Sequence, residues 1–296
     1  MTAVVLDGEA LATSIKQDLK ARVDALVAVG HRPGLGTLLV GDDGPSTSYV
    51  AMKHRDAGGL GMASTDVHLG ADATQDEVLE VIARFNADPD IDAYLMQYPF
   101  PRHLDFEAAM LAVDPAKDVD GLHPVNLGRL VQGADAPRPC TPVGIQRLLV
   151  AHDVPLAGRH VVIVGRGLTI GRPLANLLSL KREHANAAVT VVHTGVPRDR
   201  MVELCRQADV LVAAAGSPGL VTADMVKPGA AVVAAGVSFA GRKLVSDVAD
   251  GVAEVAGWLS PRIGGVGPMT RAMLLVNCVN AAERRAKSGG SAEGLA

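Results

Sequence analysis

The first hundred residues of the chain alternate between helical and strand-like patterns of apolar positions. A helix is predicted to begin near Asp7 or Gly8, because apolar side chains recur every fourth residue on one face: Leu11, Ile15, Leu19, Val23 and Val27. Apolar runs predict buried strands over residues 34–40, 63–69 and 91–96. Thr74 and Glu77 have the spacing of a capping box and predict another helix start. Strands alternating with helices predict a mostly parallel sheet with helices on its faces.

The second half of the chain repeats this alternation. The predicted strands are 160–164, 189–192, 210–214 and 230–234, and the predicted helices between them are 171–181 and 198–207. A last helical pattern extends over 269–285. Residues 112–142 contain several Pro and Gly and little periodicity, which predicts an inter-domain segment that ends at Thr141 as N-cap and Pro142 as first helical residue.

Composition narrows the class of protein. Of the 296 residues, 48% are hydrophobic and 20% are charged, a balance typical of folded rather than disordered chains. The formal net charge of −4 argues against nucleic-acid binding, which needs a basic surface. No uncharged run reaches the roughly 18 apolar residues of a membrane span. Three widely spaced cysteines and an N-terminus without a signal-peptide pattern predict a cytoplasmic protein.

A glycine-rich turn lies between the predicted strand 160–164 and the helix that follows it. Gly165, Gly167 and Gly171 have a G-x-G-x-x-x-G spacing. Such a turn lets backbone N–H groups at a helix N-terminus approach a pyrophosphate. The flanking strand and helix match the dinucleotide-binding context. The alternative is a plain tight turn in which the glycines serve packing.

The end of the next strand bears on which dinucleotide is bound. NAD sites usually place Asp or Glu there to hold the ribose, but this strand is followed by His193 and Thr194. Arg166 in the glycine turn can face a 2′-phosphate instead, since its planar guanidinium donates hydrogen bonds in pairs. The sequence therefore favours NADP. Arg198 is a second candidate, although a solvated charge at a helix start explains it better.

Several polar residues of the first half are candidates for chemistry. Tyr49 and Lys53 are four residues apart on one helical face, and Gln97 is located where a strand meets a Pro-rich turn. Asp118 and Asp120 belong to an acidic turn, DVDG. Each feature alone also fits an ordinary surface or loop. The scattered histidines and acids have no metal-ligand spacing, so no metal site is predicted.

Taken together and in order, these stretches resemble one enzyme family. They are GDDGPSTSYVAMK, QYPFP, PAKDVDGLHPVNLGRL, PCTP, VVIVGRGLTIGRP and GGVGPMT. They are similar to the signature stretches of bifunctional methylenetetrahydrofolate dehydrogenase/cyclohydrolases, over about residues 5–282.

The resemblance implies two reactions in one-carbon metabolism. NADP⁺ would take a hydride from 5,10-methylenetetrahydrofolate, and water would open the resulting methenyl cation to 10-formyltetrahydrofolate. Lys53 would be the central catalytic residue, with Gln97 as its hydrogen-bonded neighbour and Tyr49 stacked along the folate. The implied substrate contacts are Tyr49, Gln97, Asp120, Gly267 and Pro268. The implied NADP contacts are Gly165, Arg166, Gly167, Gly171, His193 and Thr194.

The resemblance also implies a fold of two α/β domains with a cleft between them. The catalytic domain would comprise residues 1–138 and a C-terminal helix over 270–286, and the Rossmann-like NADP-binding domain residues 141–268. Residues 287–296 are small and polar, which predicts a disordered tail. A homodimer is expected from the resemblance alone.

The chain departs from the family pattern at several positions of its nucleotide-binding half. Gly167 replaces a frequent Ser, Ala235 replaces Asp, and Arg262 and Ile263 replace Val-Pro. Two other functions stay open at this point. One is a different NADP-dependent dehydrogenase, which would not need Tyr49, Lys53, Gln97 and Asp120; the other is a non-catalytic dinucleotide-binding sensor.

Overall fold

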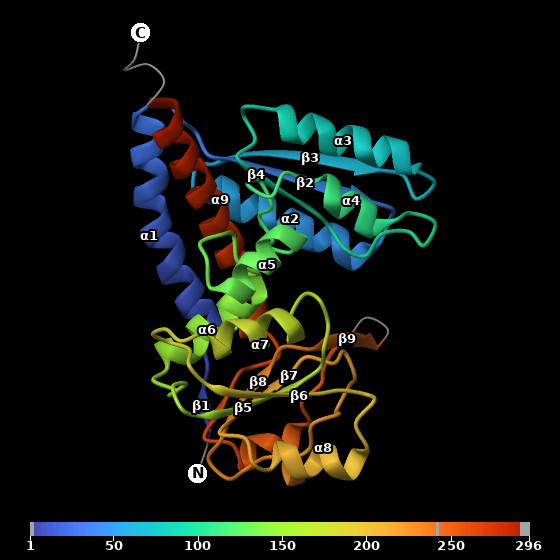
Figure 1. Cartoon of the computed structure of the whole chain (residues 1–296), viewed down its shortest axis with the longest axis vertical. Coiled ribbons are helices and arrows are strands. Elements are labelled where there is room, and N and C mark those ends of the chain that lie inside the picture. The colour runs from blue at the N-terminus through green and yellow to red at the C-terminus, as the bar shows by residue number, and fades with distance from the viewer. Residues whose placement is uncertain (1–2, 241–242, 291–296) are drawn as a thin grey trace. The chain divides into compact units, whose positions relative to one another are not determined.

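Residues 3–240 and 243–290 are described by a computed structural model (Figure 1). They form two compact units. Unit 1 comprises residues 3–13, Leu130–Ala134 and Pro139–Thr270; unit 2 comprises Ser14–Arg129, Asp135–Arg138 and residues 271–290. The divisions at residues 13 and 270 lie inside helices α1 (Gly8–Ala28) and α9 (Val266–Gly290), so each of these helices contributes residues to both units.

Unit 2 contains a parallel sheet with the strand order β3–β2–β4. Its elements are β2 (Gly34–Val40), α2 (Gly44–Gly59), β3 (Ala63–Leu69), α3 (Gln75–Ala87), β4 (Ala93–Met96), α4 (Phe106–Ala112) and α5 (Pro124–Gln132). Leu38 and Val40 of β2 pack with α3 and α4 on one face. Side chains alternate along a strand, so Thr37 faces the opposite side, where its Oγ1 is 2.8 Å from Nε2 of His54 on α2.

The segment after α4 adds an edge to this sheet. The Tyr94 N–H donates to the Lys117 carbonyl at 2.8 Å, and the Val119 N–H donates to the Tyr94 carbonyl at 3.2 Å. Asp118 thereby forms a parallel bridge with Tyr94 of β4. The carboxyl ends of β2, β4 and this segment therefore share one edge of the sheet.

Unit 1 contains a six-stranded parallel sheet among the described residues, in the order β1–β11–β8–β7–β5–β6. Its strands are β1 (Val4–Val5), β5 (His160–Val164), β6 (Ala188–Val192), β7 (Val210–Ala213), β8 (Ala231–Ala234) and β11 (Trp258–Leu259). Its remaining elements are α6 (Cys140–Ala151), α7 (Gly171–Ser179), α8 (Arg198–Cys205), the hairpin β9 (Val237–Ala240) with β10 (Lys243–Ser246), and the short helices η1 (Ala223–Met225) and η2 (Asp250–Glu254).

The topology of this sheet defines where a ligand is expected. After β5 the chain adds β6 on one side and then returns to add β7 and β8 on the other. In open parallel sheets, ligands bind at such a switch point, beyond the carboxyl ends of the strands. In Figure 1, α6 and α7 lie on one face of the sheet and α8 on the other.

Most elements form where the apolar pattern predicts them. The capping box of α3 is confirmed: the Glu77 N–H donates to Thr74 Oγ1, and the Thr74 N–H donates to a Glu77 carboxylate oxygen. The helical stripe of α3 is confirmed too, since Val78, Ile82 and Phe85 are buried.

The predicted inter-domain segment, 112–142, contains helix α5, and three of the boundaries between the two units fall within it. One local prediction is wrong. Thr141 is not an N-cap. Helix α6 begins one residue earlier, at Cys140, and the Thr141 hydroxyl is engaged 3.0 Å from the Thr270 hydroxyl instead.

The two ends of the described chain also differ from the sequence patterns. Strand β1 pairs with β11 in the sheet of unit 1. The family resemblance instead implies that residues 1–138, which include β1, belong to the catalytic domain. Helix α9 continues through Gly290, into the expected disordered tail. The rest of that predicted tail, 291–296, lies outside the described residues.

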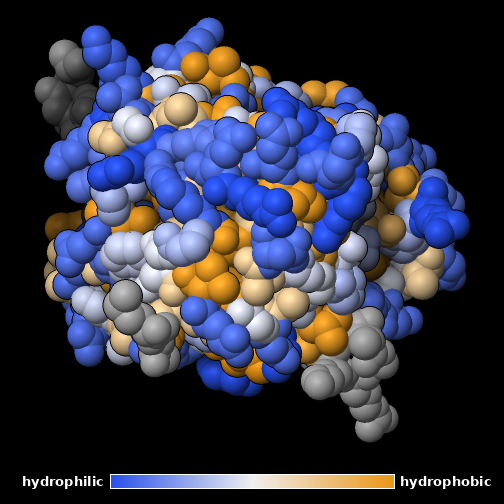
Figure 2. Space-filling model, turned by 90° about the horizontal axis from the view of Figure 1, so that it is seen from below, coloured by the Kyte–Doolittle hydropathy of each residue, from blue (hydrophilic) through white to orange (hydrophobic). Residues whose placement is uncertain are grey.

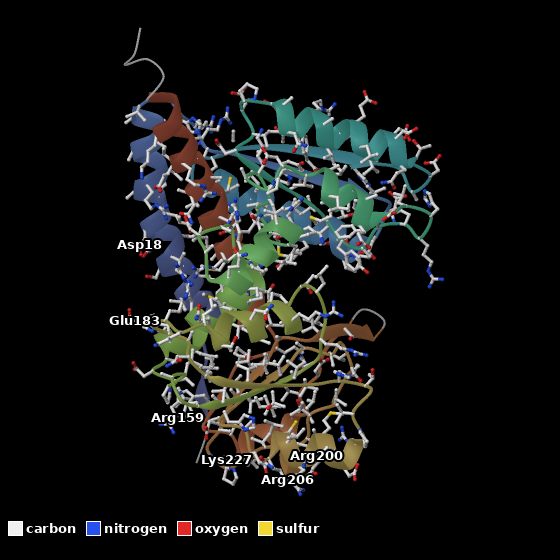
Figure 3. All side chains as sticks on the ribbon, viewed as in Figure 1. Asp18, Arg159, Glu183, Arg200, Arg206 and Lys227 are labelled. Carbon is white, nitrogen blue, oxygen red and sulfur yellow. The ribbon has the colours of Figure 1, made fainter. Side chains whose placement is uncertain are left out.

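Polar and charged side chains cover most of the face seen in Figure 2, and apolar side chains form small separate patches there. Figure 3 labels Arg200 of α8 and Arg206, the residue that directly follows α8. Arg200 pairs with Glu203, and Arg206 pairs with Asp224. Among residues 3–240 and 243–290, no helix is both long and apolar enough to cross a membrane.

Candidate active site

Helix α2 carries the central residue of the candidate site in unit 2. The helix starts where the Asp43 carboxylate accepts a hydrogen bond from the Ser46 N–H at 3.0 Å, an N-cap that satisfies a free donor. Tyr49 and Lys53 then lie one turn apart on the same side of α2. Lys53 is only 4% exposed, although lysine is rarely buried without a partner.

Lys53 is held by two neighbours. Its Nζ donates to Oε1 of Gln97 at 3.0 Å. The Gln97 Nε2 donates to the carbonyl of Tyr98 at 2.8 Å, which orients the amide so that its oxygen faces the lysine. Nζ also lies 4.9 Å from the centre of the Tyr49 ring, a cation–π distance. The structure thus brings together three residues that the sequence separates by up to 48 positions.

The two acids of the DVDG turn have different environments. Asp118 is buried, and its carboxylate accepts hydrogen bonds from the N–H groups of Gly121 and His123 and from Nδ2 of Asn126. These bonds fix the turn that precedes α5, so Asp118 has a structural role that the sequence pattern does not reveal.

Asp120 is electrostatically linked to the candidate site. Burial raises the pKa of its carboxyl group, while the charge of Lys53 opposes that shift and the charge of Asp118 adds to it. Asp120 is therefore within electrostatic range of the buried lysine.

Lys117, the first residue of KDVDG, has a structural role that the sequence patterns do not predict. It is buried, and its Nζ donates to the carbonyls of Phe85 and Asp88 at 2.8 and 2.7 Å, at the C-terminal end of α3. A cation is favourable there because the helix end is electronegative. Burial, and secondarily Arg285, lower the pKa of Lys117. No pattern in the sequence distinguishes this lysine from an exposed one.

The predicted residues of unit 2 meet because the sheet is parallel. Helix α2 follows β2, Gln97 follows β4, and Asp120 follows the edge segment beside β4. All three strands end at one edge, so Tyr49, Lys53, Gln97 and Asp120 gather there. A buried lysine beside an amide and a carboxyl group is suited to proton transfer.

The glycine loop of unit 1 is shaped for close approach of a ligand. Gly165 has φ +128°, and a Cβ on it would lie 2.1 Å from the Ala214 carbonyl oxygen. A Cβ on Gly171 would lie 2.2 Å from the Gly165 carbonyl oxygen. Gly167 has open space around it, so a side chain such as serine would fit there. Helix α7 begins at Gly171 without a side-chain cap. The Arg172 N–H donates to the Gly167 carbonyl at 3.2 Å, so only part of the usual set of N–H groups at a helix start is left for an anion.

The end of β6 adjoins this loop. The Gly165 N–H donates to the Val192 carbonyl at 2.8 Å, so His193 and Thr194 come directly beside the glycine turn. The six residues that follow β6, His193 to Arg198, include no carboxylate. Arg166 is exposed in the loop. The uncapped helix start, the glycines and this arginine fit the pyrophosphate and phosphate groups of a dinucleotide.

Three other candidates lie elsewhere. Arg198 donates to the Leu220 carbonyl at 3.2 Å, in agreement with its ordinary role at a helix start. Gly267 and Pro268 belong to the first turn of α9 and to unit 1; Gly267 is exposed and Pro268 is buried.

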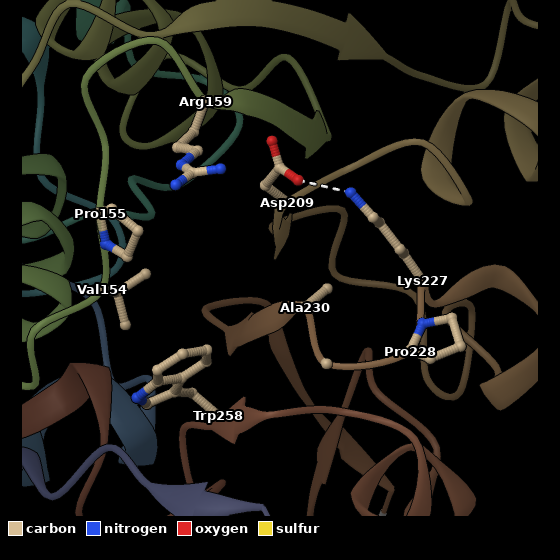
Figure 4. Close-up of a pocket in the computed structure, with 9 residues that line it drawn as sticks. Val154, Pro155, Arg159, Asp209, Lys227, Pro228, Ala230 and Trp258 are labelled. Carbon is tan, nitrogen blue, oxygen red and sulfur yellow. Dashed lines mark hydrogen bonds and ion pairs between the residues drawn. The ribbon is translucent and has the colours of Figure 1, made fainter.

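A shallow cavity of about 230 Å³ lies at the other edge of the unit 1 sheet (Figure 4). It is lined by Val154, Pro155, Arg159, Asp209, Lys227, Pro228, Gly229, Ala230 and Trp258. Arg159, Asp209 and Ala230 directly precede β5, β7 and β8. The cavity is therefore at the amino ends of the strands, away from the glycine loop. Within the described part of the chain, no group of three or more His, Cys, Asp or Glu could hold a metal ion.

A parallel sheet with a glycine loop at its switch point, together with a second α/β unit that contains a buried lysine, defines a two-domain dinucleotide-dependent enzyme. Residues 6–120 match the catalytic domain of the tetrahydrofolate dehydrogenase/cyclohydrolase family, and residues 139–286 match its NAD(P)-binding domain. The chain belongs to the tetrahydrofolate dehydrogenase/cyclohydrolase family.

Individual relatives agree with this assignment. The chain is 51% identical over 290 residues to a bifunctional protein FolD from Syntrophotalea carbinolica, covering 98% of this chain and 99% of that protein. The crystal structure of the bifunctional FolD enzyme from Campylobacter jejuni matches with a TM-score of 0.91 and 37% identity, covering 96% of this chain and 99% of that one. A Trypanosoma brucei enzyme, solved with NADP cofactor and inhibitor, matches with a TM-score of 0.91 and 36% identity, covering 97% and 99%.

Proposed function

We propose that this enzyme oxidises 5,10-methylenetetrahydrofolate to the methenyl cation with NADP⁺ and hydrolyses that cation to 10-formyltetrahydrofolate. The observation that carries the proposal is the buried Lys53, hydrogen-bonded to Gln97 at 3.0 Å within a catalytic domain of this family.

Lys53 is the group that we assign to proton transfer in the hydrolytic step. The methenyl substrate is a cation, and a second positive charge beside it is unfavourable, so the substrate favours the neutral amine. The neutral Nζ accepts a proton as a water molecule attacks the methenyl carbon. The same proton returns to the folate nitrogen when its bond to that carbon breaks, and the proton of the new hydroxyl group leaves to solvent as the formyl C=O forms. Gln97 orients the amine without adding charge, and Tyr49 packs along the folate.

Asp120 is assigned to substrate binding. The edge of a pterin presents a row of N–H donors, and a carboxylate accepts such donors in pairs. Asp118 is not suited to this role, because its two oxygens already accept three hydrogen bonds within the protein. Gly267 and Pro268 are proposed as folate contacts on the resemblance of the GGVGPMT stretch alone.

The coenzyme half supports NADP over NAD. The proposed contacts are Gly165, Arg166, Gly167 and Gly171 in the loop, and His193 and Thr194 after β6. With no carboxylate directly after β6 to repel a 2′-phosphate, Arg166 is free to bind it. The coenzyme supplies the hydride acceptor; the protein aligns it with the substrate and needs no acid or base for that step.

We further propose that the enzyme is a cytoplasmic homodimer. The cytoplasmic assignment is supported by the sparse and widely spaced cysteines of the sequence, Cys140, Cys205 and Cys278, a usage that suits a reducing compartment. Sedimentation of the purified protein tests the dimer, and a monomer at all concentrations would contradict it.

The test of the main proposal is formation of the methenyl product from methylenetetrahydrofolate, with NADP⁺ and NAD⁺ in parallel. Faster turnover with NADP⁺ is expected. Turnover with NAD⁺ alone would contradict the role of Arg166. If neither coenzyme supports turnover, hydrolysis of added methenyl substrate distinguishes a cyclohydrolase from a protein without either activity.

A further inference from the structure

One carboxylate of unit 1 is completely buried beside the glycine loop, and the function proposed so far does not use it. Asp247 follows β10 and has no exposed surface. Its Oδ2 accepts hydrogen bonds from the N–H groups of Ala215 at 2.7 Å and Gly216 at 2.9 Å. Its Oδ1 has no hydrogen-bond partner among the described residues. A buried charge with half of its acceptor capacity unused is unfavourable for folding, which indicates another reason for its presence.

Asp247 contacts the turns that end two neighbouring strands. Ala215 and Gly216 follow β7, and Gly236 follows β8. A Cβ on Gly236 would lie 1.8 Å from Oδ2 of Asp247, so the carboxylate packs directly on the Gly236 backbone. The carbonyl of Ala213 accepts the N–H of Gly236 at 2.7 Å. The carboxylate therefore links the carboxyl-end turns of β7 and β8.

The turn after β7 is also the wall on which the glycine loop packs. A Cβ on Gly165 would lie only 2.1 Å from the Ala214 carbonyl oxygen, so the loop backbone packs directly against this turn. The Ala214 N–H donates to the Val164 carbonyl at 2.8 Å, at the end of β5. A shift of the Ala214–Gly216 turn would thus move the backbone that must approach the pyrophosphate.

We propose that Asp247 is a positioning residue for the coenzyme site. By accepting hydrogen bonds from the N–H groups of Ala215 and Gly216, its carboxylate holds the turn after β7 against the glycine loop. The proposal rests on the proposed NADP-dependent function. Ligand sites need their backbone donors held within about 0.5 Å of the productive geometry. Charge-assisted bonds to two successive N–H groups provide that rigidity in a turn without regular pairing.

Two variants of Asp247 distinguish its hydrogen bonds from its charge. Both N–H groups donate to Oδ2, so the amide oxygen of Asp247→Asn can accept both bonds while the charge is lost. Asp247→Ala removes both acceptors and leaves two buried donors unsatisfied. Asp209→Ala is the matched control, because Asp209 accepts the His160 N–H at 3.0 Å in the same sheet but at its opposite edge.

The experiment uses the full chain and measures NADPH binding directly, by the change in coenzyme fluorescence. Asp247→Ala is expected to raise the Kd about tenfold, equivalent to roughly 1.4 kcal/mol. The Kd of Asp247→Asn is expected to stay within about threefold of the wild-type value, because this variant retains both hydrogen bonds. Asp209→Ala is expected to leave the Kd unchanged, because Asp209 is remote from the glycine loop. Hydrolysis of added methenyl substrate serves as an internal control, because it needs no coenzyme, and is expected to be unchanged in all variants.

Three results would overturn the proposal: wild-type affinity in Asp247→Ala, equal weakening in Asp247→Asn and Asp247→Ala, or parallel loss of hydrolysis and coenzyme binding. Should Asp247→Ala fail to fold, Asp247→Ser replaces it, since its shorter side chain cannot hold both N–H groups. If the wild type itself binds no NADPH, the proposed coenzyme function fails and the role of Asp247 fails with it; if only the variant comparison fails, the proposed function stands.

Discussion

The Nζ of Lys53 donates to Oε1 of Gln97 at 3.0 Å, across 44 positions of sequence. The pairing joins a helix that follows β2 to a turn that follows β4, and it orients the lysine by an uncharged group. A carboxylate in the place of Gln97 would stabilise the charged amine, whereas the amide leaves the neutral form accessible for proton transfer.

Replacement of Lys53 by Met is expected to lower the rate of methenyl hydrolysis by about 10²–10⁴-fold, because it removes the proposed proton acceptor. Dehydrogenase turnover should fall much less, since hydride transfer uses no such group. The two rates are measured on the same preparation, with Lys20→Met, exposed on α1, as the control. Full hydrolytic activity in Lys53→Met would refute the assigned role.

The two aspartates of DVDG should separate binding from stability. Asp118→Asn places an NH₂ group opposite an N–H donor of Gly121, His123 or Asn126, so unfolding should become easier by about 1–3 kcal/mol. Asp120→Asn should leave the unfolding midpoint unchanged and weaken folate affinity. Urea unfolding and titration with a non-reactive folate analogue measure the two effects, and equal behaviour of both variants would argue against the distinction.

Folate affinity should depend on pH through Asp120. Burial raises the pKa of Asp120 above its ordinary value of about 3.9, and the carboxylate is the form that accepts the pterin donors. Affinity should therefore fall as the pH decreases through that raised pKa. Asp120→Asn should bind weakly and without this acid dependence. An acid limb that persists in the variant would assign it to another group.

Glycine substitutions in the loop should differ by position. Gly165→Ala places a Cβ 2.1 Å from the Ala214 carbonyl and a side chain at φ +128°, so coenzyme affinity and stability should both fall, the latter by about 1–3 kcal/mol. Gly167→Ser meets no atom within 4 Å of its Cβ and should keep wild-type stability. Thermal unfolding and NADPH binding test the pair. If Gly167→Ser lost as much stability and coenzyme affinity as Gly165→Ala, the open space around Gly167 would not be enough to accommodate a side chain.

An ion pair between α1 and α9 should contribute to stability in a pH-dependent way. Arg22 donates from Nε and Nη2 to the two oxygens of Glu283, each at 2.8 Å, and these bonds lower the pKa of Glu283. Their contribution is present above the unfolded pKa of about 4.3 and is lost as the pH falls through the lowered folded value.

Both side chains of this pair are about one-third exposed, so the contribution should be only ~0.5–1 kcal/mol. Glu283→Gln should lower the urea midpoint at pH 7 and have little effect at a pH below the lowered pKa of Glu283. Glu80→Gln, exposed on α3, is the control. A constant difference at both pH values would show that packing rather than charge is responsible.

The sequence by itself determined the alternation of strands and helices, the start of α3 and the glycine loop. These are local properties: apolar periodicity, a capping pair three residues apart, and glycine where a side chain would collide. The resemblance of its motifs also indicated the correct family, and the four polar residues that it singled out in the first half do come together in unit 2.

Only the tertiary structure decided what each polar group touches. Asp118 and Asp120 are two residues apart, yet Asp118 accepts three hydrogen bonds from the protein, whereas the pKa of Asp120 is set by burial and by the charge of Lys53. Thr141 has the sequence of an N-cap and instead contacts Thr270. Asp247 lies 31 residues from Gly216 and carries no motif. These contacts depend on which strand ends share a sheet edge, and sheet order is a long-range property that no local pattern encodes.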